Sequence, residues 1–196
     1  MNDKMKENIN LAIEEHLENT RQMRKNYVGK IADIAQAITK ALRKNGTIYI
    51  CGNGGSTADA QHIAAELVGR FQRERKALAA VALSTDTSIL TSVANDYGFE
   101  KIFSRQVEAL VRKSDILWAF STSGKSANII EAAKAAKEKL AFVIAFTNKP
   151  QSTLESISDI CLCTNTKSTA QSQEMHQLAY HIICDIVETN VTNNHK

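Results

Sequence analysis

Five short apolar runs, each flanked by small polar residues, constrain the fold of this chain more than any other feature of its sequence. They cover residues 47–51, 79–83, 116–120, 142–146 and 159–163. Stretches with the period of a helix separate most of them, at residues 56–70, 86–111, 126–139 and 169–190. Strands that alternate with helices pair in parallel, and the helices cover both faces of the sheet. The sequence therefore predicts an α/β fold, a three-layer sandwich with a five-stranded parallel sheet flanked by helices.

The residues before the first apolar run predict an N-terminal helical extension. Apolar side chains recur there every four residues and form one stripe: Met5, Ile9, Ile13 and Leu17. Asn26 and Gly29 predict a break before a second helix. We assign residues 1–29 to the extension and residues 30–190 to the α/β core, within a single domain spanning 1–196. The stripe has no obvious place inside this domain, so we expect it to pack against the same helix of another subunit.

Composition excludes several classes of protein. The chain has 24 Lys and Arg against 21 Asp and Glu, and a net charge of +3 is too small to indicate nucleic-acid binding. No apolar run approaches the roughly 18 residues that span a membrane. The N-terminus is charged and has no apolar signal-peptide segment. We therefore expect a cytoplasmic protein that binds neither nucleic acid nor membranes.

Two polar loops follow apolar runs, at the strand ends where parallel sheets bind ligands. The first, at residues 52–56, reads Gly-Asn-Gly-Gly-Ser, and the second, at residues 121–126, reads Ser-Thr-Ser-Gly-Lys-Ser. Glycine lets the backbone approach an anion, and hydroxyl and N–H groups can surround a phosphate. Each loop could also be a plain turn with a helix cap. A nucleotide-binding P-loop would need glycine at Ala119. Two such loops at two strand ends favour a phosphate site.

Two pairs of polar residues lie at helical spacing. His62 and Glu66 are four residues apart, on one helix face, where they could share a metal, serve as acid and base, or form a plain surface pair. Gln173 and His181 are eight residues apart, on broadly the same side of the last helix. The apolar neighbours of His181 equally suit a histidine of the core.

Six segments, in order along the chain, carry a family resemblance. They are Cys51–Ser56, Asp59–Phe71, Ala94–Phe99, Phe103–Val107, Ser121–Ser126 and Gln173–His176. Together, over about residues 30–188, the chain resembles the phosphoheptose isomerases of the sugar-isomerase (SIS) domain superfamily. The resemblance implies a homotetramer. It also implies an aldose–ketose isomerisation of sedoheptulose 7-phosphate, through an enediol, to D-glycero-D-manno-heptose 7-phosphate (α and β). This is the first committed step toward the heptose of bacterial surface lipopolysaccharide or capsule.

The resemblance also implies a role for individual residues. The phosphate would be held by Ser121, Thr122, Ser123 and Ser126. The sugar would be flanked by Asn53, Gly54, Gly55, Ser56, Asn95 and Asp96, with Glu66 and Gln173 also in contact with the substrate. One zinc ion (Zn2+) per subunit would be bound by His62, Glu66, Gln173 and His181. Glu66 and His181 match the catalytic pair, as proton carrier and acid. A carboxylate bound tightly to zinc is a poor base, so these two roles of Glu66 compete.

Two other functions are consistent with the fold that the sequence predicts. The first is a non-catalytic SIS module that binds a sugar phosphate, of the kind that associates with the replication initiator. Such modules lack the Glu and His found here at positions 66 and 181, which favours the enzyme. The second is an isomerase of another phosphosugar. The chain also departs from the family at Gln171 and Ser172, where Arg-Ile is usual.

Overall fold

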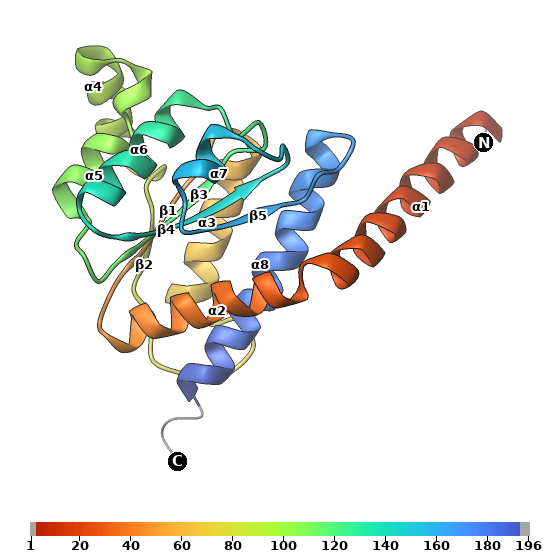
Figure 1. Cartoon of the computed structure of the whole chain (residues 1–196), viewed down its shortest axis with the longest axis horizontal. Helices are drawn as coiled ribbons and strands as arrows, with labels where there is room; N and C mark the ends of the chain where they lie inside the picture. Colours follow the sequence, from red (N-terminus) through yellow and green to blue (C-terminus); the bar gives the residue numbers. More distant parts are fainter. Residues whose placement is uncertain (1–2, 193–196) are drawn as a thin grey trace.

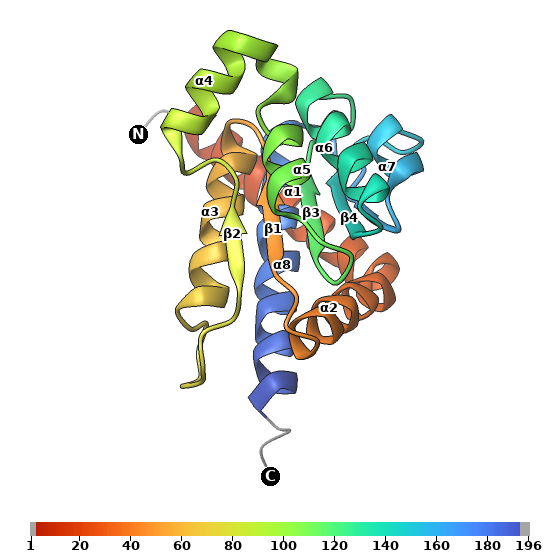
Figure 2. The ribbon, with the colours of Figure 1, turned by 90° about the vertical axis from the view of Figure 1, so that its left-hand side faces the viewer.

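A five-stranded parallel sheet forms the centre of the molecule (Figure 1). The structure is a computed structural model, which describes residues 3–192. Its strands are β1 (Ile48–Cys51), β2 (Ala80–Ala82), β3 (Ile116–Phe120), β4 (Phe142–Thr147) and β5 (Ile160–Cys163). They are arranged in the order β2-β1-β3-β4-β5, and Figure 2 shows the first four side by side. The predicted sheet is confirmed, because each strand begins and ends within one residue of its expected position.

Helices cover both faces of the sheet and enclose two apolar layers. One face carries α2 (Val28–Arg43), α3 (Gly55–Val68) and α8 (Thr169–Thr192). The other carries α5 (Ser104–Leu110), α6 (Ala127–Glu138) and α7 (Thr153–Ile157). Successive strand residues point to opposite faces. Trp118 therefore packs into the first layer, and its neighbours Leu117 and Ala119 pack into the second. The three-layer sandwich is confirmed.

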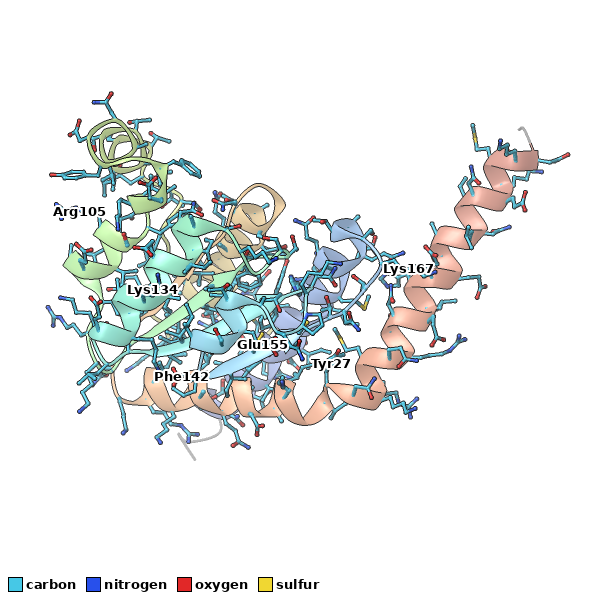
Figure 3. All side chains as sticks on the ribbon, turned by 45° about the horizontal axis from the view of Figure 1, so that its top comes forward. Tyr27, Arg105, Lys134, Phe142, Glu155 and Lys167 are labelled. Atoms are coloured by element: carbon cyan, nitrogen blue, oxygen red, sulfur yellow. The ribbon has the colours of Figure 1, made fainter. Side chains whose placement is uncertain are left out.

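The N-terminal helix α1 (Asp3–Asn26) projects away from this body (Figure 1). The predicted stripe is exposed on it, with Met5 54% and Ile13 53% accessible, while Met23 near its end is buried. Figure 3 shows α1 side chains extending into open space along most of its length, with Lys167 beside it. Lys167 donates to Glu15 of α1 at 2.8 Å.

The structure corrects two helix boundaries. Gly29 lies inside α2, and the break falls at Tyr27, so the N-terminal helix ends at Asn26 rather than at residue 29. A single glycine is tolerated within a helix at a modest cost, and this one does not adopt a positive φ. The segment expected to be helical over 86–111 is interrupted at Gly98, whose φ is 93°, and again at Ile102 and Phe103.

The three parts of that segment are α4 (Thr87–Tyr97), the 3-10 turn η1 (Phe99–Lys101) and α5. The short α7 was not expected from the sequence. Residues 1–2 and 193–196 of the predicted domain lie outside the described residues. Within 3–192, none of the helices combines the length and apolar character that crossing a membrane requires.

Two glycine substitutions test these boundaries. A Cβ at Gly29 would meet nothing within 4 Å, so Gly29→Ala should stabilise the folded state by about 0.5–1 kcal/mol, the helical preference of alanine over glycine. A Cβ at Gly46, beyond the end of α2, would lie 2.3 Å from the Ser114 carbonyl oxygen. Gly46→Ala should therefore destabilise the fold by roughly 1–3 kcal/mol.

Urea unfolding at one fixed protein concentration, followed by circular dichroism, measures both changes. A Gly29→Ala variant less stable than the parent chain would show that α2 does not run through residue 29.

Candidate functional site

The two polar loops predicted from the sequence meet at the centre of the sheet. Cys51 at the end of β1 pairs with Ala119 near the end of β3, so the segments after these strands are neighbours. The strand order also reverses here, since β1 is followed by β2 on one side and by β3 on the other. Ligands of open α/β sheets bind at this position.

A cavity of about 310 Å³ lies between the loops. Seven of the predicted ligand-binding residues line it together with Gln173: Asn53, Gly54, Gly55, Ser56, Ser121, Thr122 and Ser126. Phe120 and Thr169 complete the lining. The structure thus brings most of the predicted phosphate and sugar residues into one space.

Hydroxyl groups converge on one side of this cavity. Ser121 Oγ donates to Ser126 Oγ at 3.0 Å and lies 3.4 Å from Ser123 Oγ. Ser123 itself is exposed and does not line the cavity. Ser126 is the N-cap residue of α6, yet its side chain makes no capping hydrogen bond. Ile129 N–H donates to the Ser126 backbone oxygen at 3.1 Å, and the N–H groups before it are left to an anion, which the helix dipole also favours.

An asparagine pair that the sequence did not reveal joins the two loops. Asn53 Nδ2 donates to Asn128 Oδ1 at 2.9 Å, and Asn128 Nδ2 donates to Asn53 Oδ1 at 2.8 Å. Asn128 is buried in the first turn of α6. The sequence around Asn128 does not indicate its pairing with Asn53, because the two residues are 75 positions apart.

Gln173 closes the cavity from the start of α8. A Cβ at Gly55 would lie 2.4 Å from Gln173 Nε2, so a larger residue there would displace this amide. Gln173 precedes His181 by eight residues, or about 12 Å of helical rise. Its place among the zinc ligands stays a prediction.

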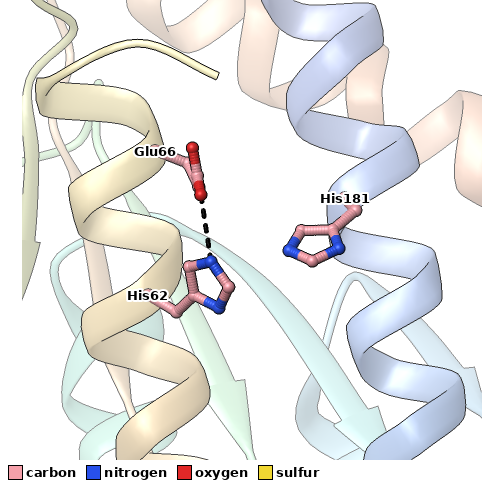
Figure 4. Close-up of side chains that lie close together, drawn as sticks. All are labelled: His62, Glu66 and His181. Carbon is pink, nitrogen blue, oxygen red and sulfur yellow. Dashed lines mark hydrogen bonds and ion pairs between the residues drawn. The ribbon is translucent and has the colours of Figure 1, made fainter. Parts of the chain in front are cut away.

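Three of the four predicted metal ligands gather between α3 and α8 (Figure 4). One ligand atom each from His62, Glu66 and His181 lies within 4.8 Å of the others. His62 Nε2 is 3.0 Å from Glu66 Oε1, as expected for a pair four residues apart on one helix. The His62 and His181 rings meet edge to face, with centroids 5.0 Å apart. We call these three residues the His–Glu–His cluster.

Hydrogen bonding around His62 tests whether the cluster suits a metal ion. The Tyr180 hydroxyl donates to Asp59 Oδ1 at 3.4 Å and lies 3.1 Å from His62 Nδ1. In the tautomer that carries its proton on Nδ1, His62 donates to this hydroxyl oxygen and has a lone pair on Nε2. That lone pair faces a carboxylate oxygen of Glu66. A metal ion would bridge these two acceptors, whereas the other tautomer donates Nε2–H to Glu66 Oε1 at 3.0 Å. The donor set fits zinc.

The surroundings of the cluster shift the pKa values of Asp59 and His181. Burial raises the pKa of Asp59 to about 6, against the hydrogen bond from Tyr180 and the charge of His62. Burial and the neighbouring His62 lower the pKa of His181, against the opposing effect of Glu66. His181 is thus neutral at pH 7 and offers one lone pair and one N–H. The Phe71 ring packs beside it, with centroids 5.6 Å apart.

Asn95 and Asp96 are not brought to the cavity by this chain alone. Both are exposed on α4, which stands apart from the sheet in Figure 1. Asn95 Nδ2 donates to Asp96 Oδ1 at 2.7 Å, and neither residue lines the cavity. Their contact with the sugar stays a prediction.

Comparison with known proteins agrees with this arrangement. A polar cavity at the β1–β3 junction of a parallel sheet defines a small-molecule site of SIS type, and the SIS domain family matches residues 13–148. A phosphoheptose isomerase of Helicobacter hepaticus is 49% identical over 167 residues, which are 85% of this chain and 84% of the relative.

Two solved structures have the same fold over nearly their whole length. The phosphoheptose isomerase of Neisseria gonorrhoeae has a TM-score of 0.89 at 41% identity, covering 94% of this chain and 99% of its own. That of Francisella tularensis has a TM-score of 0.90 at 35% identity, covering 96% and 100%. The chain belongs to the phosphoheptose isomerase family of SIS domain proteins.

Proposed function

We propose that this protein converts sedoheptulose 7-phosphate to D-glycero-D-manno-heptose 7-phosphate for bacterial heptose synthesis. The observation that carries the proposal is the meeting of Glu66 and His181, from two different helices, in one cluster. Family membership supports the same reaction. A module that only binds sugar phosphates has no use for a carboxylate and an imidazole held together in this way.

The phosphate anchors the substrate at the cavity between the loops. The hydroxyls of Ser121, Thr122 and Ser126 and the open N–H groups of α6 are the donors that a phosphate needs. The cavity and the His–Glu–His cluster are separated along α8 by the rise from Gln173 to His181, about 12 Å. In the substrate, the phosphate is likewise remote from C1 and C2. Binding energy gained at the phosphate can therefore orient the reacting carbons.

The isomerisation requires one proton carrier that serves both reacting carbons. Glu66 removes a proton from C1 of the ketose, and the electron pair of that C–H bond forms the enediol. The same carboxyl then returns a proton to C2, which generates the aldose. The neutral His181 ring donates its N–H proton to the developing oxyanion and takes a proton back from the neighbouring hydroxyl.

We further propose one zinc ion per subunit, held by His62, Glu66 and His181; Gln173, the fourth ligand that the family resemblance implies, lines the phosphate cavity and is not among the side chains gathered here. The gathering of one ligand atom from each of these three residues within 4.8 Å of the others supports this assignment. When bound, zinc would polarise the carbonyl oxygen of the sugar.

Assembly into a homotetramer is the third part of the proposal. The exposed stripe of α1 needs a partner, and the same face of a second copy supplies one of matching character. Helix α4 is also exposed, with no buried residue among Thr87–Tyr97. A neighbouring subunit that covers it would bring Asn95 and Asp96 close to a second site. We also propose a cytoplasmic location, because a phosphorylated sugar is charged and stays in the compartment where it is made.

Replacing Glu66 tests the reaction. Glu66→Gln keeps the size of the side chain and removes the base, so kcat on sedoheptulose 7-phosphate should fall by at least about 100-fold. NMR of the product measures the rate. Glu131→Gln on α6, which loses ion pairs with Lys101 and Lys134 on the opposite face, is the control and should keep the parent rate. Near-parental turnover by Glu66→Gln would remove Glu66 from the mechanism.

Elemental analysis tests the zinc site. The purified protein should contain up to one zinc per chain, and His62→Ala should lose it, since the imidazole supplies one of the ligands. His16→Ala is the matched control, because His16 is an exposed histidine paired with Glu174 and should leave the zinc content unchanged. A metal-free preparation with full activity would exclude a catalytic zinc.

Charged substitutions in the stripe test the assembly. Ile9→Glu with Ile13→Glu places two charges on the apolar face of α1 and should shift the tetramer to smaller species. Multi-angle light scattering measures the mass. Asn8→Glu with Asn10→Glu adds the same charge beside the stripe, and this control should remain tetrameric. An unchanged mass for the double isoleucine variant would show that the stripe is not the assembly face.

A further inference from the structure

Glu188 is a buried carboxylate on α8 that the proposed chemistry does not use. It lies two turns after His181 and is 0% exposed. Burial of a charge is unfavourable unless it is paired. Here Oε1 accepts from the backbone N–H of Phe71 at 2.9 Å, and Oε2 accepts from those of Gln72 and Arg73, both at 2.8 Å. Burial raises the pKa of Glu188, but these donors and Arg75 outweigh it and hold the pKa below its usual value.

Arg75 connects this carboxylate to the end of α3. Its side chain is 4% exposed, and its Nε lies 3.3 Å from Glu188 Oε1 as an ion pair. Its Nη2 donates to the backbone oxygen of Glu66 at 2.8 Å, and Nη1 donates to that of Gly69 at 3.2 Å. The last carbonyls of a helix have no partner within it. Arg75 therefore caps the C-terminal turn of α3, the turn that carries Glu66.

The contacts form one connection between the two helices of the site. Glu188 belongs to the helix of His181, and Arg75 holds the backbone of Glu66 itself. The segment bonded to Glu188 also begins at Phe71, whose ring lies against His181. Apolar packing of α3 and α8 is non-directional. These hydrogen bonds and ion pairs are directional, so they fix the position of α3 along α8 and its rotation about its own axis.

We propose that Glu188 and Arg75 are positioning residues that set the separation of Glu66 from His181. The proposal rests on the proposed function, in which these two groups act on one substrate. Catalytic groups need to be held within about 0.5 Å of their productive positions, and a displacement of about 1 Å can cost roughly 100-fold in rate. The segment at residues 71–75, which is bonded to Glu188, supports the cluster from the side away from the phosphate cavity.

Glu188→Gln tests the proposal while keeping the side chain's size. The amide has one acceptor oxygen for three N–H groups and no charge for Arg75. We expect kcat to fall at least about tenfold, with KM within about threefold of the parent value because the phosphate contacts are remote. Zinc affinity, measured by competition with a chelating dye, should fall about 10- to 100-fold.

Asp115→Asn is the matched control for lost stability. Asp115 is also a buried carboxylate that accepts from backbone N–H groups, those of Thr47 and Arg112, both at 2.8 Å. These contacts lie at the amino ends of β1 and β3, away from the phosphate cavity at the carboxyl ends of these strands. The control should lower Tm to a similar degree and leave kcat and zinc affinity unchanged.

Parental kcat and zinc affinity in Glu188→Gln would overturn the proposal, as would equal losses in Asp115→Asn at equal Tm. If Glu188→Gln does not fold, Arg75→Lys decides, because lysine keeps the charge and cannot hold Glu188 and two carbonyls together. Parental kcat in Arg75→Lys overturns the proposal, and a tenfold loss at unchanged KM supports it. A parent protein that turns over no phosphosugar defeats the proposed function instead, and the zinc affinities then test the positioning alone.

Discussion

The hydrogen-bonded pairing of β1 with β3 is the constraint on which the rest of the site depends. In the register that places Cys51 beside Ala119, the loops at 52–56 and 121–126 leave the sheet side by side. Their hydroxyl and N–H groups then face one cavity. The first loop also leads directly into α3, so the same pairing fixes where that helix begins. From this starting point, the helical repeat places His62 and Glu66 toward α8, where His181 completes the cluster.

The sequence could predict whatever depends on local pattern. Apolar runs of five residues identify the strands, and a spacing of four places His62 and Glu66 on one face. Contacts between distant segments leave no such pattern, so Asn128 and Glu188 could not be recognised before the fold was known. Gly29 and Gly98 show the limit of local rules. Both are glycines within helical patterns, and only Gly98 adopts the positive φ that ends a helix.

The departure from the family at 171–172 has a structural explanation. Gln171 donates to Glu15 Oε2 at 2.7 Å and ties α1 to the start of α8. Ser172 is fully buried, with its hydroxyl 2.9 Å from that of Thr164, which follows β5. The next residue, Gln173, lines the cavity. Gln171 and Ser172 thus connect the start of α8, which carries the cavity residue Gln173, to α1 and to the segment after β5.

The most direct test of the account is the fate of the transferred hydrogen. Sedoheptulose 7-phosphate should be incubated with the protein in D2O and the product examined by NMR. The Glu66 side chain is 20% exposed, so the proton that it takes from C1 exchanges with solvent before one is returned to C2. The expected product is D-glycero-D-manno-heptose 7-phosphate carrying deuterium at C2. A heptose product with no deuterium at C2, or no heptose product, would contradict it.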